Sequence, residues 1–118
     1  MNQLQLFREI LAMYRRHGWR LRRALMRAET RAELRGGSQG DEADLEIFES
    51  APVVESEVDA MWLARPSHEG REAWELRLVA ETPYALFELF EPDEEEEDRE
   101  DVRREMEARL REYAGGRT

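Results

Sequence analysis

The sequence predicts an α+β fold in which an antiparallel sheet of three or four strands packs against an N-terminal helix and is flanked by a C-terminal helix. Three observations predict this fold: an apolar stripe of helical period near the N-terminus, two-residue alternation in the middle of the chain, and a second helical stripe near the C-terminus. The chain has 118 residues, and domains cluster near about 100 to 150 residues. We therefore expect a single domain over residues 1–118.

The N-terminal stripe has apolar residues three and four positions apart: Leu4, Phe7, Leu11 and Tyr14. This spacing predicts a helix over residues 3–17. Gly18 follows two arginines and a histidine, and glycine after cations is typical of a helix end. The apolar seam continues beyond Gly18, so residues 19–27 are either a strand or an extension of the first helix. We favour a strand, because glycine inside a helix costs about 1 kcal/mol relative to alanine.

The segment after residue 27 carries weaker signals. Thr30 followed by Glu33 forms a capping-box pattern, which predicts one or two helical turns before Gly36. Residues 36–41 are expected to form a flexible loop, and residues 41–52 show no period long enough to classify.

The middle of the chain predicts a β-hairpin with strands at about residues 53–65 and 72–81. Apolar and charged residues alternate in both segments, and residues 66–70 between them are rich in turn-forming residue types. Placing both apolar faces on one side fixes the parity of the strand register. We expect Trp62 to lie opposite Trp74 in that register.

The last third of the chain predicts one more strand and a helix. Residues 84–90 are apolar on both sides of a strand and equally fit a short helix begun by Pro83, and we favour a third strand of the meander. Asp93 and Glu96 form a second capping-box pattern. The stripe that follows predicts a C-terminal helix ending near Ala114. Its apolar members are Val102, Met106, Leu110 and Tyr113.

Charge is divided unevenly along the chain, and every basic side chain is an arginine. Residues 1–36 hold nine arginines against three glutamates, a net charge of +6, whereas residues 37–118 hold nine arginines against 25 acidic residues, a net charge of −16. The formal net charge is −10. This division favours contact between oppositely charged surfaces, either within the chain or across a dimer.

The composition excludes several chemistries. The chain has no cysteine and no lysine, which excludes disulfides, thiol nucleophiles, iron–sulfur clusters, Schiff-base lysines and P-loop lysines. Because His17 and His68 are the only histidines, we expect no metal or other cofactor. No apolar run approaches the roughly 20 residues that cross a bilayer, and charges interrupt the N-terminal apolar stretch. We therefore expect a cytoplasmic protein that contacts no membrane.

One group of charged residues has the composition of a catalytic site. The predicted hairpin sets Asp59 opposite Arg77, with Glu75 and Glu57 nearby. Metal-dependent nucleases of the D…(D/E)-x-K type use a similar set of carboxylates and a base, but here an arginine stands in place of the lysine and stays charged. The solvent-facing side of any hairpin carries such charges, so we expect no enzyme.

The arginine-rich N-terminal region is the feature that bears on two possible functions, protein binding and nucleic-acid binding. Its candidate binding residues are Arg15, Arg16, Trp19, Arg20, Arg22, Arg23 and Arg27. As an alternative, arginines at this density follow a phosphate backbone while Trp19 stacks on a base, as in a nucleic-acid-binding protein. The acidic total charge and the acid run from Glu91 to Asp101 oppose that alternative. We therefore expect a non-catalytic interaction or adaptor module that binds a protein partner or itself as a homodimer, with the arginines meeting the acids of residues 94–97.

Overall fold

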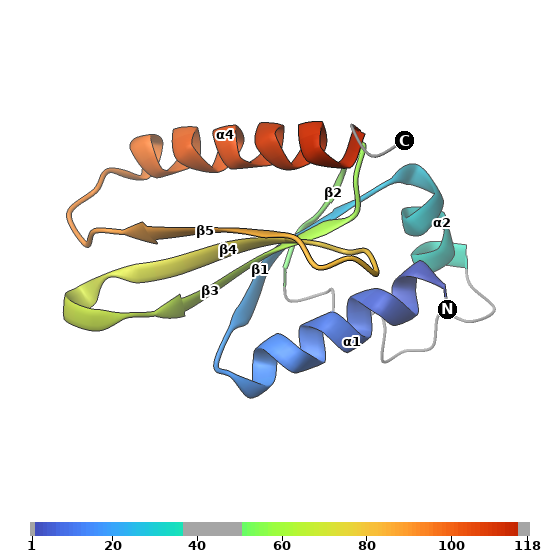
Figure 1. Ribbon diagram of the computed structural model, residues 1–118, viewed down its shortest axis with the longest axis horizontal. Coiled ribbons are helices and arrows are strands. Elements are labelled where there is room, and N and C mark those ends of the chain that lie inside the picture. The colour runs from blue at the N-terminus through green and yellow to red at the C-terminus, as the bar shows by residue number, and fades with distance from the viewer. Residues whose placement is uncertain (1, 37–50, 116–118) are drawn as a thin grey trace.

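The computed structural model describes residues 2–36 and 51–115 and has three layers, with helices on both faces of a central sheet (Figure 1). Helices α1 (Gln3–Arg16) and α2 (Ala28–Gly36) lie on one face, and α4 (Glu96–Gly115) lies along the other. The strands are β1 (Arg20–Met26), β2 (Val53–Glu55), β3 (Ala60–Pro66), β4 (Glu72–Leu78) and β5 (Ala85–Phe90), and a short 3-10 turn, η1 (His68–Gly70), joins β3 to β4. The α+β class is confirmed. The predictions for residues 37–50 lie outside the described residues.

The sheet is mixed, and it has five strands in the order β2-β1-β3-β4-β5. β1 and β2 are parallel, whereas the other neighbouring pairs are antiparallel. The prediction of a purely antiparallel sheet of three or four strands was therefore wrong. Parallel neighbours need a crossover connection, and α2 lies in the connection between β1 and β2. Alternation in the sequence identifies strands but does not encode their direction.

The predicted strand at residues 53–65 is divided, because the chain turns at residues 56–59 between β2 and β3. Asp59 lies buried in this turn, and its carboxylate accepts hydrogen bonds from the Arg27 N–H at 2.8 Å and from the Thr30 hydroxyl at 2.9 Å. These contacts join segments about thirty residues apart in sequence. The alternation of residues 53–65 is a local pattern, so it could not predict a turn that depends on these distant contacts.

Both predicted capping boxes were wrong. α2 begins at Ala28, before Thr30, and the Thr30 hydroxyl donates to Asp59 instead of capping the helix. α4 begins at Glu96, which lies beyond the predicted cap at Asp93. Short polar residues compatible with a cap are common, and tertiary contacts decide which of them is used.

The hairpin of β3 and β4 is confirmed, but the predicted register was wrong by two residues. Trp62 lies opposite Leu76, and Trp74 lies opposite Ala64. Such a shift keeps every side chain on its predicted face, because the side-chain period of a strand is two. The two tryptophan rings still meet diagonally, with centroids 5.9 Å apart and an interplanar angle of 66°.

The two alternatives left open by the sequence are resolved as strands. Gly18 has φ of +85°, the left-handed conformation expected of a residue that ends α1, and residues 20–26 form β1. The register shifts between Leu21 and Arg23, which marks a β-bulge in β1. Residues 85–90 form β5 at the edge of the sheet.

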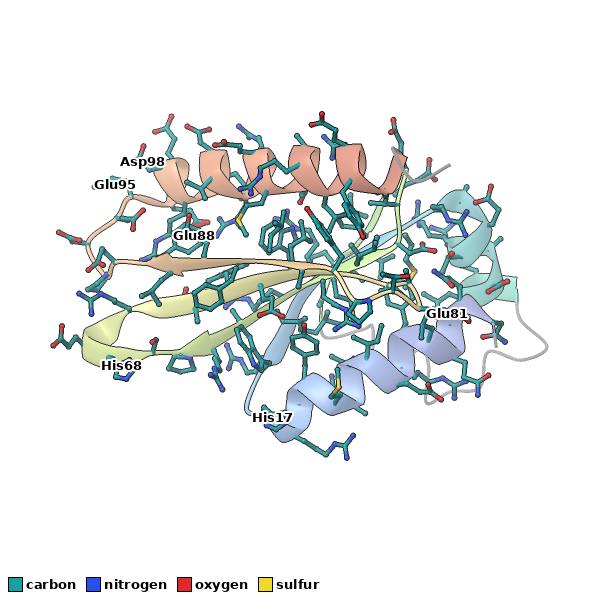
Figure 2. All side chains as sticks on the ribbon, in the orientation of Figure 1. His17, His68, Glu81, Glu88, Glu95 and Asp98 are labelled. Atoms are coloured by element: carbon teal, nitrogen blue, oxygen red, sulfur yellow. The ribbon has the colours of Figure 1, made fainter. Side chains whose placement is uncertain are left out.

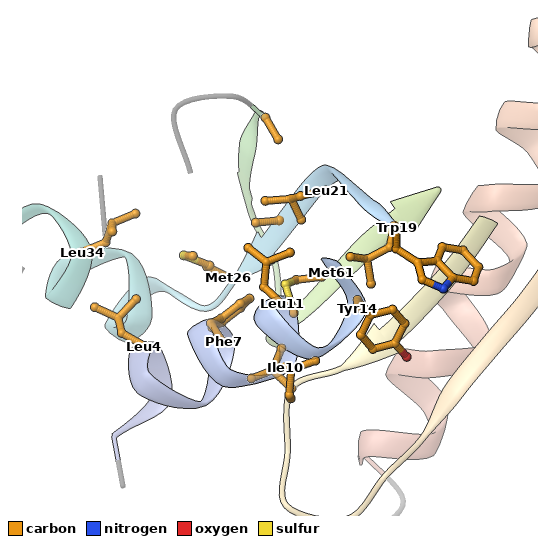
Figure 3. Packing of buried hydrophobic residues seen from close by; sticks show 14 of the residues in the cluster. Leu4, Phe7, Ile10, Leu11, Tyr14, Trp19, Leu21, Met26, Leu34 and Met61 are labelled. Carbon is orange, nitrogen blue, oxygen red and sulfur yellow. The ribbon is translucent and has the colours of Figure 1, made fainter. Parts of the chain in front are cut away.

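Each face of the sheet has its own apolar core. On the first face, α1 and α2 pack on the sheet around residues such as Phe7 and Met61 (Figure 3). On the second face, α4 packs on Trp62 through Met106 and Leu110. Among the described residues, β5 contributes side chains to the cluster under α4 and none to the cluster under α1. Among the described residues, β5 is therefore packed on its α4 side only.

Candidate protein-interaction surface

The predicted arginine cluster is partly assembled, around a hollow of about 620 Å³ where α1 ends and β1 begins. The hollow is lined by Arg15, Trp19, Arg20, Leu21 and Arg22. Arg16 is exposed in the last turn of α1. The Arg22 guanidinium also lies 4.9 Å from the ring centroid of Trp74. Several arginines that are separated in the sequence therefore lie close together at this end of the molecule.

Trp19, which the sequence presented as a stacking residue, lies in the core. Only 9% of its surface is exposed, and Tyr14 meets its ring edge-on with centroids 5.9 Å apart. The Arg65 guanidinium lies 4.8 Å from the Trp19 ring centroid and donates a 2.8 Å hydrogen bond to the His17 carbonyl. Stacking of a nucleobase on Trp19 would have to displace these contacts.

Arg23 pairs with acidic residues of α4. Its Nη1 atom lies 3.5 Å from Glu107 Oε2 and 3.8 Å from Glu100 Oε1. Contact between an N-terminal arginine and the C-terminal helix was predicted, but with residues 94–97. For Arg23 that choice of partners was wrong, because the bulged strand β1 crosses the sheet opposite the middle of α4, beyond the acidic start of the helix.

The nuclease-like group of charges is not assembled. Arg77 faces Met61 across the hairpin and does not face Asp59. Asp59 is only 3% exposed, forms an ion pair with Arg27 at 3.3 Å and accepts the Thr30 hydroxyl, so it holds the start of α2 against the sheet. Within residues 2–36 and 51–115, no group of three or more histidine, aspartate and glutamate side chains is arranged to hold a metal ion.

A polar contact fastens α1 to β4. The Tyr14 hydroxyl donates a hydrogen bond to Glu75, and the Arg77 guanidinium lies 6.0 Å from the Tyr14 ring centroid. Burial, and then the hydrogen bond to Glu75, raises the pKa of Tyr14 to about 12. Beside this contact lies a hollow of about 320 Å³ that is bordered by Met13.

The sheet surface beyond this hollow is apolar and exposed. Phe87 of β5 pairs with Glu75 of β4, and 59% of the Phe87 surface is exposed. Leu89 lies on the same side of β5 and is 37% exposed, and Met13 is 40% exposed. These are three of the four large apolar side chains that are exposed in the described part of the chain. We name the surface formed by Met13, Glu75, Phe87 and Leu89 the open half-face.

The position of the helices explains why this surface is open. Strands lie about 4.8 Å apart, so β5 is about 14 Å from β1, and a helix about 10–12 Å wide that packs over β1 does not reach it. α1 packs beside α2 over β1, while α4 packs against β4 and β5 from the opposite face. No described helix therefore covers β5 on the α1 side.

Sequence reasoning did not find the open half-face, because it took its candidate binding residues only from the arginine-rich N-terminal region. The signal was present in residues 84–90, which are apolar on both sides. A strand of this kind is typical of a sheet that is covered on both faces. The sequence alone could not show that this strand lies at the edge of the sheet with one side uncovered by a helix.

The chain matches no protein-family model, no curated protein and no solved structure. In the described segments, no helix combines the length and apolar character that a membrane span requires.

Proposed function

We propose that this chain is a non-catalytic protein-interaction module and that a partner polypeptide binds its open half-face. The supporting observation is the joint exposure of Phe87 and Leu89 on an edge strand whose other side is packed under α4. Scattered exposed apolar side chains are normal on a protein surface, whereas a contiguous group is typical of an interaction site.

The chemistry of the open half-face favours binding. Full burial of a large apolar side chain contributes about 1.5–3 kcal/mol, and aromatic residues are enriched at the centres of interfaces. The charged groups in and beside this surface already form hydrogen bonds within the chain, because Glu75 accepts a hydrogen bond from the Tyr14 hydroxyl and Arg77 Nε donates to the Leu78 carbonyl at 3.1 Å. A partner that covers Phe87 and Leu89 therefore gains apolar contact without breaking these bonds.

The proposal is tested with the double variant Phe87→Ser, Leu89→Ser and with Val54→Ser as a matched control. Val54 is also apolar and 43% exposed, but it lies on β2 at the opposite edge of the sheet. In pull-downs from the native cell extract at two salt concentrations, we expect the native protein and Val54→Ser to retain the same partner and the double variant to lose it. The double variant should stay folded with a modestly lower melting temperature, because Phe87 and Leu89 are only partly exposed and serine is a weaker strand former. Retention of the partner by a folded double variant would contradict the proposal.

Nucleic-acid binding is the second candidate, and the hollow lined by Arg15, Arg20 and Arg22 favours it. Three phosphate contacts would give a slope of about −3 for log affinity against log salt concentration. We expect no tight binding of a generic oligonucleotide, because Trp19 is covered and the formal net charge is −10. Tight, salt-sensitive binding that is abolished by changing the three arginines to glutamine, and unaffected by Phe87→Ser, would favour this candidate instead.

A further inference from the structure

We infer that β5 accepts an additional strand from the partner and that this strand alternates apolar residues with arginine or lysine. This inference rests on the proposed function for the location of the partner, and it adds the partner's backbone conformation and chemistry. Three features of β5 carry it: the direction of its backbone groups, the exposure of side chains on the same residues, and the charges around the strand.

Alternate backbone groups of β5 point away from the sheet. The Leu78 N–H donates to the Tyr84 carbonyl at 3.0 Å, so these two residues form a hydrogen-bonded pair. Hydrogen-bonded pairs alternate along an antiparallel ladder, and the register between β4 and β5 is regular. Leu86 and Glu88 therefore also bond to β4. The outward-facing N–H and C=O groups are those of Ala85, Phe87 and Leu89, and no strand in the described part of the chain pairs with them.

The residues with outward backbone groups are the same residues that expose apolar side chains. An added strand would form main-chain hydrogen bonds with Phe87 and Leu89 and would cover both side chains at the same time. Proteins usually protect an edge strand with charge, proline or short length. β5 has six residues, with no proline among them and Glu88 as the single charged residue.

Glu88 is the one charged residue of β5 that protects this edge from strand pairing. Its Oε2 atom accepts a 3.1 Å hydrogen bond from the Leu89 N–H, which satisfies one of the outward donors. Glu88 lies opposite Trp74 on the α4 side of β5 and forms no ion pair with any described residue. When the carbonyl of an added strand takes the Leu89 N–H, the Glu88 carboxylate is released to pair with a basic side chain of that strand.

The charges around β5 favour a basic partner. Glu81 lies in the turn that leads into β5, and Glu95 and Asp98 lie beyond its other end (Figure 2). The nearby arginines Arg77 and Arg99 are already bonded within the chain, to the Leu78 carbonyl and to Glu72. Charge complementarity of this kind attracts a basic segment and opposes an acidic one. A second copy of this chain has a formal net charge of −10 and would bring like charges together. The added strand is therefore apolar on the α1 side and basic on the α4 side.

The test follows amide hydrogen exchange in the full-length protein by NMR, with a short blocked peptide of alternating arginine and valine as the probe. At a peptide concentration about ten times its dissociation constant, exchange at Phe87 and Leu89 should slow about tenfold. Leu86 and Glu88 serve as internal controls, because their amides already bond to β4 and should not change. A peptide of alternating glutamate and valine, of the same length, should have no effect.

Two variants separate the contribution of apolar contact to peptide binding from the contribution of the ion pair. Phe87→Ser should abolish protection by the peptide, and Glu88→Gln should weaken peptide binding about two- to fivefold at low salt, the range of one exposed ion pair. Val54→Ser should bind as the native protein does.

The outcomes distinguish strand addition from docking on the open half-face. If the peptide binds in a Phe87-dependent way without protecting the Phe87 and Leu89 amides, strand addition is wrong and the proposed function stands. Absence of peptide binding, or equal binding of the glutamate–valine peptide, also overturns strand addition by a basic segment. Protection of the same amides that rises with protein concentration in the absence of peptide would show that a second copy is the occupant.

Discussion

Tyr14 connects the core to the candidate surface. Its ring packs edge-on against Trp19, and its hydroxyl donates to Glu75, the residue opposite Phe87. The helical spacing of the sequence identified Tyr14 as part of a buried stripe. It could not identify Glu75 as its partner, because the spacing within a helix does not specify which strand the helix meets. The border of the open half-face therefore depends on a contact between distant parts of the chain.

Stability should fall at high pH because of Tyr14. Folding raises its pKa from 10.0 to about 12, so the folded state favours the protonated phenol. The stability that the protonated phenol contributes to the folded state is fully present below pH 10 and is lost as the pH rises through about 12. Urea denaturation at several pH values measures it: the native protein should lose more stability across this window than Tyr14→Phe does. Equal losses in the two proteins would contradict a buried, hydrogen-bonded phenol.

At the scale of elements, two tryptophans of the hairpin hold α4 on the sheet. Trp62 is fully buried, and its Nε1–H donates to Glu107 Oε2 at 2.7 Å. The buried guanidinium of Arg103 lies 4.5 Å from the ring centroid of Trp74 and pairs with Glu100 at 2.9 Å. Both tryptophans therefore contribute contacts to α4 as well as to each other.

Truncation of Trp62 should be strongly destabilising. We expect Trp62→Ala to lower the free energy of unfolding by roughly 3–5 kcal/mol, because it removes a fully buried ring and leaves a cavity under α4. Trp62→Phe keeps most of the buried ring and loses the hydrogen bond to Glu107, so its cost should be smaller. Chemical denaturation of the two variants measures both effects. Near-native stability of Trp62→Ala would show that the hairpin does not pack against α4 as described.

Local patterns predicted the elements better than their pairing. Gly18 marked the end of α1, and alternation assigned the hairpin side chains to the correct faces. A shift of two residues leaves alternation unchanged, so the pattern could not decide whether Trp62 faces Trp74 or Leu76. The division at residues 56–59 and the parallel pairing of β2 also depend on contacts between distant segments.

The sequence predicted the arginine-lined hollow better than it predicted the open half-face. The arginine hollow follows from the density of arginines near residues 15–22, which the sequence shows directly. The exposure of Phe87 depends on which strands α1 covers, and that is decided by packing over the whole sheet. The residue types of residues 84–90 therefore predicted a strand but not which of its side chains is exposed.

Over the whole molecule, the two faces of the sheet are covered to different extents. α4 covers β5 from one side, whereas the other side of the same strand exposes Phe87 and Leu89. The predicted attraction between oppositely charged regions is present in the pairs of Arg23 with Glu100 and Glu107. The apolar surface at β5 has no such partner within the described residues, and this difference underlies the proposal of an external partner.

Photocrosslinking from position 87 tests that proposal most directly. Phe87 is replaced by the photoreactive residue p-benzoylphenylalanine, which retains an aromatic ring, and the same residue at position 54 on β2 provides the control. After irradiation of the native cells, we predict a discrete product of this chain with another polypeptide from position 87 and no such product from position 54. Absence of a product from position 87, or the same products from both positions, would contradict binding at the open half-face.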